Sequence, residues 1–128
     1  MLNAVIVDAN AVSRGLLSTV LTDGSYNVVG STHTAPLGYL MVQKYQPHVF
    51  CIALDQVEDG NHVVEQIRSH YPKTLVFMMS GELDAPMLQK AMARGVSGFI
   101  VKPFNADAVL KTIRNTVLAM IKKQQVQS

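Results

Sequence analysis

Apolar residues follow two alternating patterns along the chain. The first run, residues 2–7, is almost continuously apolar and stops at Asp8. It is followed by apolar residues at helical spacing, which are Val12, Leu16, Leu17, Val20 and Leu21. A short apolar run indicates a buried strand, whereas an apolar residue at every third or fourth position indicates a helix with one buried face. The chain therefore begins with a strand and then a helix.

The same alternation occurs five times. The predicted strands cover residues 2–7, 26–30, 49–54, 75–79 and 98–101, and the predicted helices cover residues 12–21, 36–45, 61–69, 85–94 and 106–123. Strands as apolar as residues 49–54 are expected where helices cover both faces of a parallel sheet, because neither face then meets water. We predict an α/β fold built on a doubly wound, five-stranded parallel sheet.

Residues that begin and end helices agree with these boundaries. Asn10 and Asn105 can cap helix starts with a side-chain oxygen, and Gly95 can adopt the left-handed conformation that ends a helix. No linker or repeat divides the 128 residues, which suffice for one continuous core. We expect a single domain over residues 1–121, without an output domain, and a fraying polar tail over residues 122–128.

Composition narrows the class of partner and the compartment. Only 16% of the residues are charged and the formal net charge is +2, which is too small to indicate a polyanionic partner. The cations of the last predicted helix have no aromatic residues among them, so we expect a solvated face and no nucleic-acid binding; they are Lys111, Arg114, Lys122 and Lys123. The single cysteine, Cys51, is expected to be buried. Without an apolar stretch of membrane length or a signal peptide, we expect a cytoplasmic protein.

The residues just after each predicted strand are the candidates for chemistry, because ligands of doubly wound sheets bind at the carboxyl ends of the strands. These residues are Asp8, Ala9, Ala53, Leu54, Asp55, Ser80, Gly81, Lys102 and Pro103.

Four motifs closely resemble the receiver domain of bacterial response regulators over almost the whole chain. They are Val7-Asp8-Ala9-Asn10, Asp59-Gly60, Met79-Ser80-Gly81 and Gly98-Phe99-Ile100-Val101-Lys102-Pro103-Phe104. The resemblance implies a flavodoxin-like (βα)5 fold with strand order 2-1-3-4-5. It also implies a role in two-component signalling.

The resemblance implies a site that this chain lacks in part. Receivers carry two adjacent acidic residues after the first strand and a phosphate-accepting aspartate after the third, and their carboxylates bind Mg²⁺. Asp8 matches the first acidic residue, but Ala9 stands at the second and Ala53 at the acceptor. Neither methyl group can bind a metal or accept a phosphoryl group. We therefore expect no metal or other cofactor, no enzymatic activity, and a degenerate pocket.

The rest of the pocket matches the family. Ser80 fits the hydroxyl position, Lys102 the lysine position, and Phe99 the aromatic residue whose rotation often accompanies signalling. The Lys102-Pro103 bond is expected to be cis, as it typically is in the family. Without a metal, Lys102 is free to pair with Asp8 or with Asp55.

The leading hypothesis is a stand-alone pseudo-receiver that binds proteins without being phosphorylated. Receivers commonly signal through a surface that corresponds here to residues 85–94, 98–101 and 106–122, and we place Met87, Phe99 and Lys111 on it. A histidine kinase, a phosphotransfer protein or an output protein is the expected partner, with the first helix as the common contact for kinases. The chain is expected to be a monomer or a homodimer.

Several alternatives stay open. If the third strand were slipped by two residues, Asp55 would become a displaced phosphate acceptor. A flavodoxin-like small-ligand binder is a further possibility, although the turn after the first strand has no glycines. The methionines Met87, Met92 and Met120 fit either a core or a partner surface. Metal binding by histidines is not expected, because His33, His48, His62 and His70 are scattered.

Overall fold

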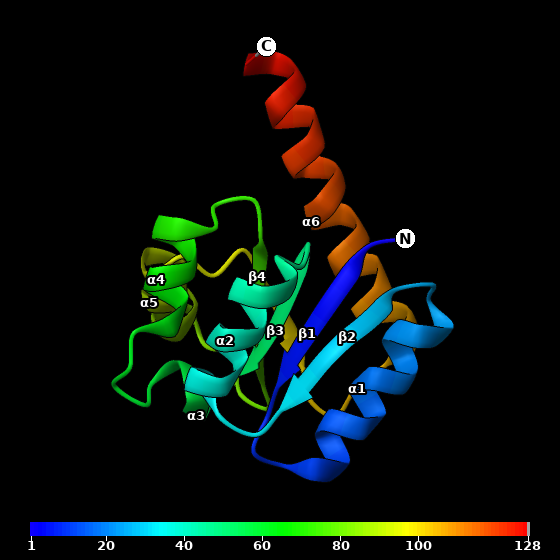
Figure 1. The fold of residues 1–128 in the computed structure, drawn as a ribbon, viewed down its shortest axis with the longest axis vertical. Coiled ribbons are helices and arrows are strands. Elements are labelled where there is room, and N and C mark those ends of the chain that lie inside the picture. Colours follow the sequence, from blue (N-terminus) through cyan, green and yellow to red (C-terminus); the bar gives the residue numbers. More distant parts are fainter. Residues whose placement is uncertain (128) are drawn as a thin grey trace.

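A computed structural model describes residues 1–127 and shows one twisted sheet between two layers of helices (Figure 1). The five strands are β1 (Asn3–Val7), β2 (Asn27–Thr32), β3 (Val49–Ala53), β4 (Leu75–Ser80) and β5 (Gly98–Val101). They lie in the order β2-β1-β3-β4-β5 and every neighbouring pair is parallel. The predicted doubly wound α/β fold and its strand order are confirmed.

Helices cover both faces of the sheet. They are α1 (Ala11–Asp23), α2 (Ala35–Tyr45), α3 (Leu54–Val57), α4 (Val63–His70), α5 (Ala85–Arg94) and α6 (Ala106–Gln127). α1 and α6 pack on one face, and α2, α4 and α5 pack on the other (Figure 1).

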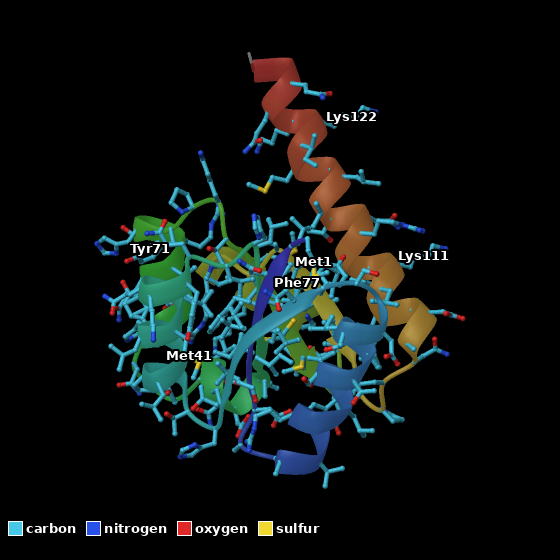
Figure 2. The ribbon with its side chains drawn as sticks, turned by 45° about the vertical axis from the view of Figure 1, so that its right-hand side comes forward. Met1, Met41, Tyr71, Phe77, Lys111 and Lys122 are labelled. Atoms are coloured by element: carbon cyan, nitrogen blue, oxygen red, sulfur yellow. The ribbon has the colours of Figure 1, made fainter. Side chains whose placement is uncertain are left out.

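Strand side chains alternate between the two faces and form two apolar clusters. Val5, Phe50 and Met78 belong to the cluster under α2, α4 and α5. Ile6 and Phe77 belong to the cluster under α1 and α6. Figure 2 shows Phe77 in the middle of the molecule. Burial on both faces explains why the sequences of β1, β3 and β4 are almost continuously apolar.

Strand β2 begins and ends later than the predicted residues 26–30. Its pairing with β1 shifts between Ala4 and Val5, so that Val29 is skipped as a bulge and the ladder continues to Thr32. The Asp8 amide then donates to the Thr32 carbonyl at 3.0 Å, which ties the end of β2 to the loop after β1. A bulge of one residue changes which side chains are buried, so apolar alternation alone could not give this boundary.

The structure contains a helix that was not predicted. Leu54, assigned to the third strand in the prediction, is the first residue of α3, and the Glu58 amide closes the turn on the Leu54 carbonyl at 3.1 Å. Four residues are too few for a helical period to appear in the sequence. The next helix, α4, begins at Val63 and not at Asn61, because His62 has a left-handed φ of 55° that a helix cannot include.

The expected tail at residues 122–128 is helical as far as Gln127, while Ser128 lies outside the described residues. The predicted caps are confirmed: Asn10 accepts from the Ser13 amide and Asn105 from the Ala108 amide, each at 3.0 Å. Gly95 ends α5 with φ of 120°. An additional cap at Asp84 accepts from the Met87 amide at 2.8 Å.

Cys51 generates a testable prediction about thiol reactivity. The side chain is fully buried in β3, and burial raises the pKa of the Cys51 thiol from 9.0 to about 12. Labelling by a thiol reagent at pH 8 should therefore be slower by at least about a thousandfold in buffer than in denaturant, because it requires unfolding. Mass spectrometry over time measures both rates, and rapid labelling in buffer would contradict the burial of β3.

The same thiol should make stability depend on alkaline pH. The unfolded chain releases the Cys51 proton near pH 9, whereas the folded chain, with its raised pKa, keeps it until about pH 12. The folded state therefore binds more protons in this interval, and the thiol lowers stability as the pH rises through it. Cys51→Ala is the matched control, since it lacks this contribution.

Candidate functional site

The candidate site lies at the carboxyl ends of the strands and is organised around Asp8. Asp8 directly follows β1 and is only 3% exposed, which makes it one of the few buried polar residues of the described chain. Its Oδ1 accepts a hydrogen bond from the Asn10 amide at 2.9 Å. Its backbone carbonyl accepts from the Arg14 guanidinium at 2.7 Å. Both donors hold the loop between β1 and α1 in place.

Lys102 supplies the positive charge that faces Asp8. Its Nζ lies 2.7 Å from Asp8 Oδ2, in an ion pair that joins the ends of β5 and β1. The Lys102 side chain is 25% exposed, whereas the Asp8 side chain is 4% exposed. Of the two partners that the sequence left open for Lys102, the structure selects Asp8. The Lys102-Pro103 peptide bond is cis, as predicted.

Ser80 ends β4 and turns its hydroxyl toward the following loop. Its Oγ donates to the Glu82 carbonyl at 2.8 Å and accepts from the Glu82 amide at 3.1 Å. The Ser80 carbonyl accepts from the Lys102 amide at 2.9 Å, which places the serine and the lysine on adjacent strands at the same end of the sheet. The hydroxyl is thus occupied by its own loop.

Ala9 and Ala53 stand where the sequence placed them. Ala9 is exposed in the loop after β1. Ala53 is the last residue of β3, is 3% exposed, and pairs in register with Met79. Its methyl group belongs to the apolar cluster under α1 and α6. The end of β3 therefore presents hydrocarbon where a phosphate acceptor would need a carboxylate.

Asp55 does not occupy the end of β3. The register of β3 with β4 ends at Ala53, so the two-residue slip that would bring Asp55 to the strand end is not present. Asp55 lies instead on α3 and is exposed. Asp55 was one of the two partners left open for Lys102, and Lys102 pairs with Asp8 instead.

The three residues proposed for a partner surface fall on two sides of the molecule. Met87 and Phe99 are half-buried and pack against the cluster under α2, α4 and α5. Lys111 is exposed on α6 and lines a cavity with Gly24 and Tyr26, on the side of α1 (Figure 2). Met87 and Phe99 thus share a face, and Lys111 does not lie on it.

The remaining methionines and two of the histidines lie at separate positions and form no common site. Met92 is 61% exposed on α5, while Met120 is half-buried against the cluster under α1 and α6. His62 precedes α4 and its Nδ1 lies 2.9 Å from Glu65 Oε2, whereas His70 ends that helix beside the Gln66 carbonyl. Among residues 1–127, no group of three or more His, Cys, Asp or Glu side chains is arranged to hold a metal ion.

Two contacts of Asp8 were not anticipated from the sequence. Asn10 was expected only as a helix cap, and Arg14 was not assigned a role. Arg14 lies on the first turn of α1, six residues after Asp8, and its contact depends on how the loop bends back. No spacing rule for strands or helices predicts such a contact.

Among the helices of the described residues, none has both the length and the apolar character needed to cross a bilayer.

Sequence comparison with known proteins matches this chain to receiver domains and to chemotaxis proteins of the CheY type. A model of the response regulator receiver domain matches residues 4–114. The chemotaxis protein CheY of Listeria monocytogenes serovar 1/2a is 31% identical over 117 residues, which cover 88% of this chain and 96% of that protein. The chemotaxis protein CheY of Thermotoga maritima is 27% identical over 113 residues, covering 85% and 92%.

Solved structures of response regulators have the same fold. The chemotaxis response regulator CheY4 of Vibrio cholerae superposes with a TM-score of 0.81 at 26% identity, over 91% of this chain and 98% of that one. The signal receiver domain of the putative response regulator NarL from Mycobacterium tuberculosis has the same fold, with a TM-score of 0.82 at 22% identity over 91% and 95% of the two chains. The fold, the match over residues 4–114 and the likeness to CheY together establish that this chain belongs to the response regulator receiver domains of two-component signalling.

Proposed function

We propose that this receiver domain binds partner proteins without aspartyl phosphorylation and carries no enzymatic activity. The observation that supports this most directly is the alanine at the end of β3, since Ala53 is buried there and its methyl side chain offers no oxygen to a phosphoryl donor. We further propose that the protein acts in the cytoplasm, in contact with a kinase, a phosphotransfer protein or an output protein, as a monomer or a homodimer.

The charge balance of the site supports a domain that works without Mg²⁺. Magnesium prefers several oxygen ligands, usually including carboxylates, in near-octahedral geometry. Asp8 is the one buried carboxylate of the described chain, and its Oδ2 is bound to Lys102 while its Oδ1 accepts from Asn10. The residues present therefore do not fit a magnesium site. The Lys102 ammonium offsets the carboxylate charge that a metal would otherwise offset.

The hydrogen bonds of the site also disfavour the two alternative functions, phosphorylation of Asp55 and binding of a small ligand at the strand ends. Phosphorylation of Asp55 would place the phosphoryl group on an exposed helical side chain, away from Ser80 and Lys102, which hydrogen-bond other groups. Small-ligand binding at the strand ends would need free polar groups there, whereas Asp8, Ser80 and Lys102 are each bonded to a neighbour.

Phosphoryl donors test the proposal. Acetyl phosphate with Mg²⁺ should leave the mass of the protein unchanged, because no carboxylate lies at the end of β3 to accept the group. Intact-mass spectrometry and peptide mapping measure this. A stable added phosphoryl group on Asp55 would establish the displaced acceptor and contradict the proposal.

A restored site gives the positive control for the same assay. The double variant Ala9→Asp, Ala53→Asp returns carboxylates to both positions while Asp8, Ser80 and Lys102 remain. Its labelling by acetyl phosphate should depend on Mg²⁺, since three clustered carboxylates provide oxygen ligands and a nucleophile. Equal labelling of this variant and the natural sequence would show that the alanines are not what prevents the reaction.

The ion pair at the centre of the site gives a stability prediction. Lys102→Met should lower the free energy of unfolding by about 2–3 kcal/mol, because it leaves the buried Asp8 carboxylate without its counter-charge. The expected loss is below that of a fully buried pair, since Lys102 is partly exposed. Chemical denaturation measures it, with Lys122→Met as the exposed control on α6. The double variant Asp8→Asn, Lys102→Met should lose less than the sum of the single changes, and simple additivity would contradict the pairing.

Partner binding gives a further prediction. Met92 on α5 and Val101 on β5 are 61% and 55% exposed, and β5 is an edge strand of the sheet. Exposed apolar side chains of this kind are candidates for a protein interface. Met92→Lys with Val101→Lys should weaken capture of partners from a native lysate at least tenfold. Val12→Lys with Leu16→Lys, at the exposed apolar residues of α1, is the matched comparison.

The comparison separates the two interfaces. If only the α1 variant loses its partners, the partner binds where kinases commonly contact receivers, and the assignment to α5 and β5 is wrong. If both variants retain every partner, the protein-interaction role itself is contradicted.

A further inference from the structure

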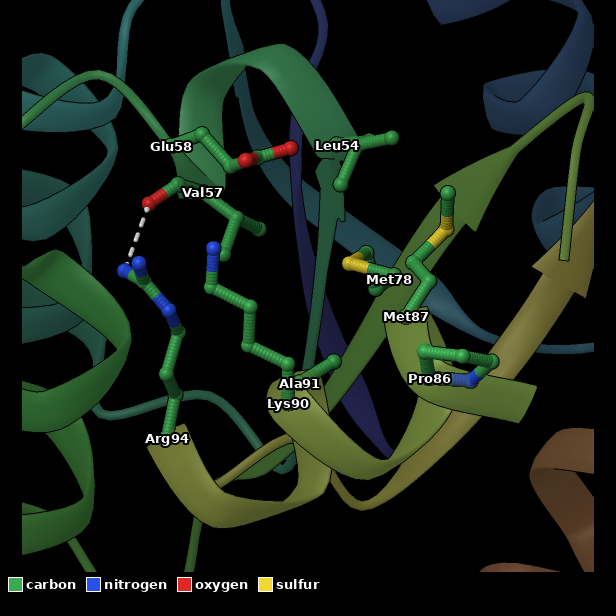
Figure 3. Close-up of a pocket in the computed structure, with 9 residues that line it drawn as sticks. All are labelled: Leu54, Val57, Glu58, Met78, Pro86, Met87, Lys90, Ala91 and Arg94. Carbon is green, nitrogen blue, oxygen red and sulfur yellow. Dashed lines mark hydrogen bonds between the residues drawn. The ribbon is translucent and has the colours of Figure 1, made fainter. Parts of the chain in front are cut away.

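A cavity separate from the degenerate pocket opens between α3 and α5. It has a volume of about 240 Å³, and Figure 3 shows the side chains that line it. Its lining residues are Leu54, Val57, Glu58, Met78, Pro86, Met87, Lys90, Ala91 and Arg94. None of the polar residues at the strand ends contributes to it. The cavity lies on the face of the sheet covered by α2, α4 and α5.

The inner wall of the cavity is apolar. Met78 comes from the sheet, Leu54 and Val57 from α3, and Met87 from α5. For comparison, an engineered apolar cavity of about 150 Å³ in another protein binds benzene. The space is therefore large enough for the side chain of a leucine or a phenylalanine. Met78 and Met87 add adaptability, because thioether side chains adjust to irregular shapes.

One cation of the rim is already paired. Arg94 Nη1 donates to the Val57 carbonyl at 3.4 Å, drawn as the dashed line in Figure 3, and lies 3.6 Å from Glu65 Oε2. These contacts join α5 to α3 and to α4. Arg94 therefore stabilises the wall of the cavity, and its charge is largely balanced by Glu65.

The two other charges of the rim have no partner among residues 1–127. Glu58 follows α3 and Lys90 lies on α5, and both side chains are exposed. Neither carboxylate nor ammonium makes a hydrogen bond or an ion pair, and they do not pair with each other. The mouth of the cavity thus carries one free negative and one free positive group above an apolar wall (Figure 3).

We propose that this cavity binds an apolar α-amino acid as its zwitterion. The side chain enters between Leu54, Met78 and Met87, the α-carboxylate meets the Lys90 ammonium, and the α-ammonium meets the Glu58 carboxylate. A simple anion would leave Glu58 facing a like charge, and a simple amine would do the same to Lys90. A zwitterion satisfies both groups at once. The proposal concerns binding at this cavity and does not rest on the loss of phosphorylation.

Binding there has a structural consequence. The ligand contacts α3, which directly follows Ala53, and α5, which carries the exposed Met92. It therefore joins the segment after the degenerate pocket to the helix of the proposed partner surface.

Nuclear magnetic resonance titration of the whole chain tests the site. L-leucine and L-phenylalanine, added to millimolar concentration, should each give saturable amide shifts confined to residues 54–58, 78, 85 and 87–94. For each amino acid, the analogue without the ammonium group and the analogue without the carboxylate should bind at least about tenfold more weakly, because each loses one charged contact. These analogues are 4-methylpentanoate and 3-methylbutylamine for leucine, and 3-phenylpropanoate and 2-phenylethylamine for phenylalanine.

Variants assign the two charges. Lys90→Gln and Glu58→Gln should each weaken binding of the amino acid about tenfold, and Glu58→Gln should leave binding of the carboxylate analogue unchanged or tighter. Lys122→Gln and Glu82→Gln are matched exposed controls that should bind like the natural sequence. Since all four side chains are exposed, folding is expected to persist, and the melting temperature checks it.

Three outcomes would overturn the proposal. The first is the absence of saturable shifts with both amino acids, and the second is shifts that map to another surface. The third is an analogue with one charge that binds as tightly as the parent amino acid. None of these outcomes bears on the acetyl phosphate experiment, so the two proposals fail separately.

Discussion

The ion pair between Lys102 and Asp8 is the contact on which the carboxyl end of the sheet depends. It joins residues 94 positions apart in sequence and connects β5 with β1, which are separated in the sheet by β3 and β4. A buried carboxylate without a counter-charge would be strongly unfavourable. The ammonium at 2.7 Å makes the burial of Asp8 possible, and the Asn10 and Arg14 contacts fix the loop around it.

The sequence predicted the sheet well because its pattern is long and redundant. The central strands β1, β3 and β4 are buried on both faces, so each appears as an apolar run, and the caps Asn10, Asn105 and Gly95 mark helix ends by local chemistry. The errors occur where one residue or one short turn decides the outcome. A bulge at Val29 extends β2, the left-handed His62 delays α4, and four residues after Ala53 coil into α3.

The sequence predicted which residues form the candidate site, but not which hydrogen bonds and ion pairs they make. Strand ends identified Asp8, Ser80 and Lys102, since parallel strands bring their carboxyl ends to one edge. Lys102 could have paired with Asp55 only if Asp55 lay near the end of β3. Asp55 lies on α3 instead, and Lys102 pairs with Asp8. The Arg14 contact and the cavity beside α3 arise from loop paths and from residues far apart in sequence, which no local pattern encodes.

The C-terminal part of helix α6 projects beyond the rest of the molecule (Figure 1). Its 22 residues extend about 33 Å, and the distal end projects past the edge of the sheet where the strands begin, opposite to the Lys102–Asp8 pair (Figure 1). Val109 and Ile113 fix the base of the helix in the core, while residues farther along, such as Leu118 and Ile121, are exposed. Over this length, a tilt of about 10° at the base would move the tip by about 6 Å. Val117 and Met120 pack against the cluster under α1 and α6 and oppose such a tilt, so the contacts along the helix, and not its length alone, set how far its exposed end can move.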